Sequence, residues 1–114
     1  MATHEDAVLM VQLLRWSTEM GGDDAANEVL ADGFDPEAAS SRDSAVSKLL
    51  TFGESVGTLV KHGLLDRDLV DDAWAVQLVW SRIGPAARRE RERLNEPRLF
   101  ENFEALVAKA LQAV

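Results

Sequence analysis

The sequence predicts an all-α protein, a single compact bundle of five or six helices that spans residues 1–114. Three observations support this fold class. In every long segment the apolar residues recur at steps of three and four, which places them on one face of a helix. No segment alternates apolar and polar residues with the β-branched enrichment typical of a strand. A chain of 114 residues has room for one hydrophobic core and not for a second.

The first predicted helix begins at Thr3 and ends at the glycine pair Gly21-Gly22. Asp6 follows Thr3 at the spacing of a capping box, in which each side chain satisfies a free backbone N–H of the other residue. Glycine ends the helix because it adopts the left-handed cap conformation without steric cost. One face of this helix consists of four large apolar residues: Leu9, Leu13, Trp16 and Met20. Four further apolar residues widen this surface: Val8, Met10, Val11 and Leu14.

Two shorter signals precede the longest helix. Asp23 is a suitable cap for a second helix that ends at Gly33, and Asp35-Pro36-Glu37 indicates a renewed helix start, with the proline at the first helical position. The residues after this start are ambiguous between a helical turn and a loop. The long helix covers about residues 42–62, and its apolar face consists of Ala45, Leu49, Phe52, Val56, Leu59 and Val60.

Asp66 is a natural cap for a helix over about residues 67–83. This helix is apolar almost all round, so it is either central in its own fold or pressed against a partner. Its two apolar faces consist of Leu69, Ala73, Val76, Trp80 and Ile83, and of Val70, Trp74 and Leu78. We expect Gly84-Pro85 to break the chain before a charged helix over residues 86–94, and a final helix to follow Pro97.

Composition excludes several function classes. The chain has no cysteine, which excludes disulfide scaffolds, thiolate zinc sites and iron–sulfur clusters, and the two histidines lack metal-ligand spacing, so we expect no metal or cofactor. The net charge of −8 argues against a nucleic-acid partner, and the arginines of residues 88–93 alternate with Glu90 and Glu92. No apolar run is long enough to span a membrane. The acidic start lacks the basic region of a signal peptide, which favours the cytoplasm.

The first functional hypothesis is a non-catalytic interaction or assembly module, a homo-oligomer or a binder of another protein. The first helix and the helix over 67–83 both offer more apolar circumference than a small bundle normally covers, and tryptophan is enriched at interfaces. The expected contact residues are Leu9, Leu13, Trp16, Met20, Val70, Trp74 and Leu78.

The alternative is a small-molecule binder or an enzyme with a pocket between helices. Glu54 lies in an apolar-rich stretch, where a partly buried carboxylate can act as a general acid or base. It can equally be a glutamate at the solvent edge or one paired with an arginine. The arginines expected near it are Arg82, Arg88 and Arg89. Gly53 and Gly57 share one helix face, and we interpret them as the site where another helix backbone comes close. No residue is assigned a catalytic role.

Several segments between Leu49 and Leu106 occur in a characteristic order. They are Phe52-Gly53-Glu54, Leu59-Val60-Lys61-His62-Gly63-Leu64-Leu65-Asp66, Trp80, Pro85, Arg88-Arg89, and Pro97-Arg98-Leu99-Phe100-Glu101-Asn102-Phe103-Glu104. In this order the chain resembles a family of small bacterial helical proteins known only as a domain of unknown function. The resemblance implies a helical fold and no particular activity or site. Many members of that family have a membrane-spanning helix ahead of this region, whereas Gln12 and Arg15 interrupt the first apolar stretch here.

Overall fold

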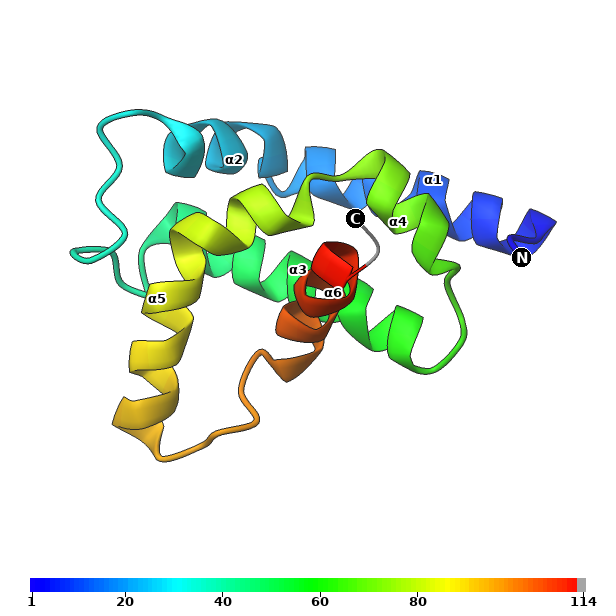
Figure 1. Cartoon of the computed structure of the whole chain (residues 1–114). Helices are drawn as coiled ribbons and strands as arrows, with labels where there is room; N and C mark the ends of the chain where they lie inside the picture. Colours follow the sequence, from blue (N-terminus) through cyan, green and yellow to red (C-terminus); the bar gives the residue numbers. More distant parts are fainter. Residues whose placement is uncertain (113–114) are drawn as a thin grey trace.

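The computed structural model describes residues 1–112, with side chains up to Ala108, and this part of the chain contains six α-helices and no strand (Figure 1). The all-α fold class is confirmed. The helices are α1 (His4–Glu19), α2 (Gly22–Leu30), α3 (Ser44–Lys61), α4 (Arg67–Ala73), α5 (Val76–Leu94) and α6 (Glu101–Gln112). The long helix predicted over 42–62 is therefore α3.

Helix α3 is the centre of the bundle, since α2, α5 and α6 all pack against it (Figure 1). The side chains with almost no exposed surface come from four helices: Leu50, Ile83, Val29, Val46, Val56 and Val70. Burial of each such aliphatic side chain stabilises the fold by about 1.5–3 kcal/mol. The helices are thus held mainly by apolar contacts with α3.

The contact of α3 with α6 is made close by two glycines. A Cβ atom added at Gly57 would lie 2.6 Å from the carbonyl carbon of Asn102, and one added at Gly53 would lie 2.7 Å from Cγ of Phe103. Both separations are far below van der Waals contact. The interpretation of Gly53 and Gly57 as a site of close helix approach is therefore confirmed.

The single helix predicted over residues 67–83 is wrong, because the chain forms α4 and α5 with a break at Trp74-Ala75. Trp74 is extended, with φ −134° and ψ 143°. Asp71 and Asp72 lie in the last turn of α4, where the helix dipole disfavours negative charge. Trp74 also packs edge-on against Phe52 of α3, with ring centroids 5.3 Å apart. This tertiary contact outweighs the helical periodicity of the segment.

The break predicted at Gly84-Pro85 is also wrong, because α5 continues through both residues and includes segment 86–94. Pro85 has no N–H for the carbonyl of Ser81, and its ring crowds that carbonyl, so a bend is expected. Figure 1 shows α5 changing direction about half-way along. Ile83 and Gly84 are buried just before the proline, and Trp80 lies against Gly84. Core packing around the bend therefore holds one helix across it.

Two expectations for the first half of the chain need correction. Gly21, in the left-handed conformation with φ 78°, is the N-cap of α2 in place of Asp23. Residues 35–41 form turns and no helix. The side chain of Asp35 accepts a hydrogen bond of 3.0 Å from the N–H of Glu37, which closes a local turn that competes with a helix. The sixth helix of the bundle comes instead from the break at residues 74–75.

Asp6 connects the start of α1 to the start of α4. Its Oδ2 atom accepts hydrogen bonds from the N–H (2.7 Å) and hydroxyl (2.9 Å) of Thr3, which confirms the predicted capping box. Its Oδ1 atom accepts a hydrogen bond of 3.0 Å from the N–H of Asp66, the N-cap of α4. Asp6 is buried. This carboxylate therefore serves two helix ends at once.

We expect the free energy of unfolding to fall as the pH drops below about 4, and Asp6→Asn to remove part of that fall. Hydrogen bonds from the N–H and then the hydroxyl of Thr3 lower the pKa of the Asp6 carboxyl from its usual 3.8. A group with a lowered pKa in the folded chain contributes stability above its unfolded pKa, and this contribution is lost as the pH falls through the folded pKa. Denaturant titrations at a series of pH values measure the effect. Identical pH dependence in both chains would contradict it.

Among the described residues, no helix combines the length and the apolar character needed to cross a membrane.

Candidate functional site

The residues predicted to form an association seam are divided between core and surface. Leu13 and Val70 are 6% and 0% exposed, so these two belong to the hydrophobic core and are not available to a partner. Leu78 is 54% exposed. The remaining members are partly buried: Leu9, Trp16, Met20 and Trp74. The α1 face that was expected to meet a partner is therefore the face that covers the core.

The exposed apolar surface of α1 lies on its other side. Val8 is 49% exposed, Val11 65% and Leu14 44%. Their steps of three place them on one face of the helix, which we call the outward face of α1. Sequence reasoning found these residues only as a widening of the apolar surface. It could not tell which side of the helix faces solvent, because both sides are apolar.

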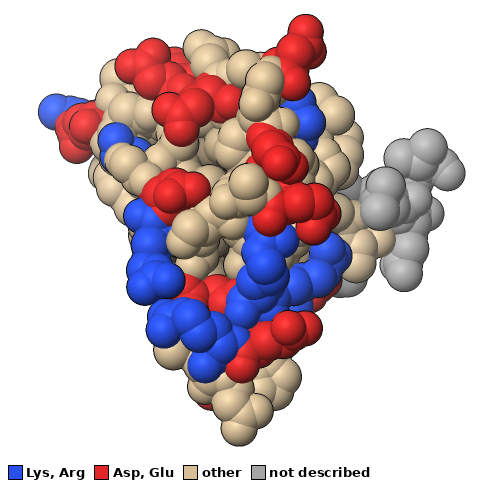
Figure 2. Space-filling model, turned by 90° about the vertical axis from the view of Figure 1, so that its left-hand side faces the viewer, with Lys and Arg blue, Asp and Glu red and all other residues tan. Residues whose placement is uncertain are grey.

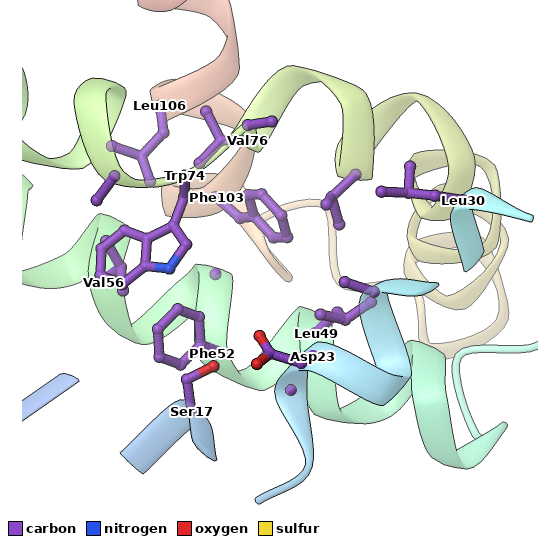
Figure 3. A pocket seen from close by; sticks show the side chains of 16 residues that line it. Ser17, Asp23, Leu30, Leu49, Phe52, Val56, Trp74, Val76, Phe103 and Leu106 are labelled. Atoms are coloured by element: carbon purple, nitrogen blue, oxygen red, sulfur yellow. The ribbon is translucent and has the colours of Figure 1, made fainter. Parts of the chain in front are cut away.

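A cluster of aromatic rings joins α1, α3 and the break after α4. The Phe52 ring centroid lies 5.2 Å from that of Trp16 and 5.3 Å from that of Trp74. Beside this cluster is a cavity of ≈ 210 Å³ (Figure 3). It is lined by Ser17, Gly22, Asp23, Ala26, Leu30, Leu49, Phe52, Gly53, Val56, Ala73, Trp74, Ala75, Val76, Val79, Phe103 and Leu106. The sequence predicted a pocket between helices around Glu54, whereas this cavity is not lined by Glu54 and depends on the break at Trp74-Ala75.

Glu54 caps helix α6. Its Oε1 atom accepts hydrogen bonds of 3.0 Å from the N–H groups of both Asn102 and Phe103, in the first turn of α6. The side chain of Asn102 donates to the hydroxyl of Thr58 (3.0 Å), one turn further along α3. The carboxylate thus satisfies two of the free N–H groups at a helix start and interacts favourably with the helix dipole. This is a structural role rather than the acid–base role considered for it.

The three arginines expected beside Glu54 have other partners. Arg82 donates to the carbonyl of Ala31 (2.9 Å), and Arg89 donates to the carbonyls of Pro36 (2.8 Å) and Ala39 (2.6 Å). The third arginine, Arg88, forms an ion pair of 3.6 Å with Glu104. Figure 2 shows the basic side chains as a band interspersed with acidic ones. Glu54 therefore does not form the expected cluster with Arg82, Arg88 and Arg89. Arg82 and Arg89 instead hold the loop after α2 against α5.

Among the residues that the structure describes, no three His, Asp or Glu side chains are placed to hold a metal ion together.

Comparison with known families shows what the chain is related to. A family model described as a domain of unknown function (DUF4760) matches residues 4–110. The chain belongs to this family. Neither the comparison with curated proteins nor that with solved structures gave a match. The family match covers all of helices α1 to α5 and most of α6.

In this DUF4760 domain, segments that carried the resemblance meet at one place. Phe103 of α6 lies over Gly53 of α3, and its ring centroid is 5.0 Å from that of Trp80 of α5. Glu54 caps the same turn of α6. Three of the ordered motifs, those that contain Gly53, Trp80 and Phe103, therefore meet at the contact of α3, α5 and α6.

Proposed function

We propose that this DUF4760 domain is a non-catalytic assembly module in which two copies associate through the outward face of α1. The exposure of Val8, Val11 and Leu14, on a helix whose opposite side already covers the core, is the observation that carries the proposal. Apolar side chains gathered on one exposed face of a helix are candidates for contact with another protein. Their transfer out of water on association contributes about 25 cal/mol per Å².

The spacing of the three residues favours a second copy of the same chain as the occupant. Val8 and Leu14 each lie three residues from Val11. If two α1 helices cross antiparallel about a two-fold axis at Val11, Val11 meets its own copy and Val8 meets Leu14. Two-fold contacts in which one patch meets itself are the commonest arrangement in homo-oligomers. The outward face is thus complementary to itself.

Charge and size define the expected strength of the association. Each copy carries a net charge of −8, so two copies repel each other at low salt. Three side chains on each copy form a contact smaller than the roughly 800 Å² per partner of a stable complex. We therefore expect a reversible dimer that becomes stronger as salt screens the repulsion.

Val11→Glu is expected to abolish the dimer, because it places two carboxylates opposite each other at the two-fold axis. The unaltered chain should shift from its 12.5 kDa mass towards twice that value with rising concentration, more strongly at high salt. The variant should keep the mass of one chain at every concentration. Light scattering after size-exclusion chromatography, over a dilution series at two salt concentrations, measures both.

Leu94→Glu is the matched control, since Leu94 is 51% exposed at the C-terminal end of α5, which lies far from α1 (Figure 1). It should associate as the unaltered chain does. If the unaltered chain keeps its single-chain mass at high concentration and high salt, self-association through α1 is wrong. If Leu94→Glu reduces association as much as Val11→Glu, the assignment to α1 is wrong.

The same proposal places the module in the cytoplasm, with protein rather than nucleic acid as its partner. A chain without cysteine needs no oxidising compartment for its fold, and its acidic surface repels phosphate backbones. Cell fractionation tests the location.

A further inference from the structure

The cavity beside the aromatic cluster lies between α1, α2, α3, α6 and the break that joins α4 to α5 (Figure 3). Its volume of ≈ 210 Å³ exceeds the roughly 150 Å³ of an engineered apolar cavity that stays dry and binds benzene. By proportion, it has room for a group of about eight non-hydrogen atoms. Most of the wall is aliphatic or aromatic, so an apolar group has a lower free energy in this cavity than in water.

The polar groups of the wall are concentrated at one place. Figure 3 shows the carboxylate of Asp23 and the hydroxyl of Ser17 beside the ring of Phe52, with the indole of Trp74 across from them. Asp23 is the one ionisable residue among the sixteen that line the cavity. The Asp23 side chain is exposed, and among the described residues its carboxylate forms no ion pair.

The carboxylate of Asp23 beside aromatic rings favours a positively charged ligand. A carboxylate next to aromatic faces attracts an ammonium group through a charge-assisted hydrogen bond and through cation–π contact. An anion would meet a negative charge and no basic side chain in the wall. The net charge of −8 also attracts cations to the molecule and repels anions from it.

We propose that the cavity binds a small organic ammonium compound, with the ammonium group at Asp23 and an apolar or aromatic body between Phe52, Trp74 and Phe103. This site is separate from the outward face of α1, because Ser17, the α1 residue in its wall, lies on the side of the helix that faces the bundle. Binding and assembly can therefore be tested independently of each other.

Three probes with the same eight-carbon skeleton isolate the charge: 2-phenylethylamine, 2-phenylethanol and phenylacetate. Titration of the full chain by calorimetry should give the amine about tenfold tighter binding than the alcohol, the order expected for one partly exposed charge-assisted contact, and no binding of the carboxylate. Shifts of backbone amide NMR signals should locate the amine at the residues of the cavity wall.

Asp23→Asn should reduce the preference for the amine over the alcohol to less than about twofold while the alcohol still binds. Asp24→Asn is the matched control, because Asp24 lies on the same turn of α2 and does not line the cavity. It should keep the preference. Failure of both the amine and the alcohol to bind the unaltered chain would overturn the site. Equal affinities for the two, or equal effects of Asp23→Asn and Asp24→Asn, would overturn the ammonium assignment.

Discussion

Replacing Gly57 by alanine is expected to lower the free energy of unfolding by about 1–3 kcal/mol, although alanine is the better helix former by about 1 kcal/mol. The added Cβ would lie 2.6 Å from the backbone carbonyl carbon of Asn102. Backbone at a capped helix start cannot rotate away as a side chain can. Either α6 must move away from α3, or the hydrogen bonds of Glu54 to its first turn must lengthen. Urea denaturation followed by circular dichroism measures the change.

Gly33→Ala is the control for this prediction, because a Cβ atom added at Gly33 meets nothing within 4 Å. Its effect should stay within about 0.5 kcal/mol, as for most surface substitutions. A Gly57→Ala chain as stable as the unaltered one would show that α6 tolerates a wider separation from α3. The close approach would then contribute little to stability.

The second large effect is expected for Glu54→Ala, a loss of about 1–3 kcal/mol in the free energy of unfolding. The change leaves the N–H groups of Asn102 and Phe103 without their acceptor in a partly buried place. It also removes a negative charge from the start of α6. Phe100 immediately precedes the helix in the left-handed conformation, with φ 62°, so the chain enters α6 by a sharp turn that the Glu54 contact stabilises.

One variant separates the contribution of the hydrogen bonds from that of the charge, and a second is the control. Glu54→Gln keeps one carbonyl oxygen that can accept both bonds, so its loss should be less than half that of Glu54→Ala. Glu28→Ala, at an exposed position of α2, should be nearly neutral. Hydrogen exchange of the Asn102 and Phe103 amides should accelerate in Glu54→Ala more than exchange in α2 does. Uniform acceleration across all helices would show that the loss is not local to the start of α6.

These two predictions concern the contact of α3 with α6, which supports both the proposed ligand cavity and the position of α1. Phe103 contributes to the wall of the cavity, and α3 carries the Phe52 ring against which Trp16 of α1 packs. Glu54, the candidate acid or base of the sequence analysis, thus stabilises the contact of α3 with α6. Charge for ligand binding comes instead from Asp23, a residue that sequence reasoning had assigned to a helix cap.

The sequence by itself determined the elements whose causes are local. The all-α class, the capping box of Thr3 and Asp6, and the extent of α3 all depend on residues within a few positions of one another. Periodicity, capping and glycine stops act over the same short range. The pair Gly53 and Gly57 belongs here too, because two glycines on one helix face need a close neighbour whatever that neighbour is.

Only the tertiary structure decided which groups meet. Glu54 and its partner amides are 48 and 49 residues apart in the chain, and no local pattern encodes such a pairing. An apolar periodicity does not show what covers each apolar residue. It therefore could not distinguish the outward face of α1 from the face that covers the core. The break at Trp74-Ala75 and the continuous helix across Pro85 have the same origin. In both places packing against α3 or within the core outweighs the local preference of the backbone. The cavity exists because the chain breaks at Trp74-Ala75.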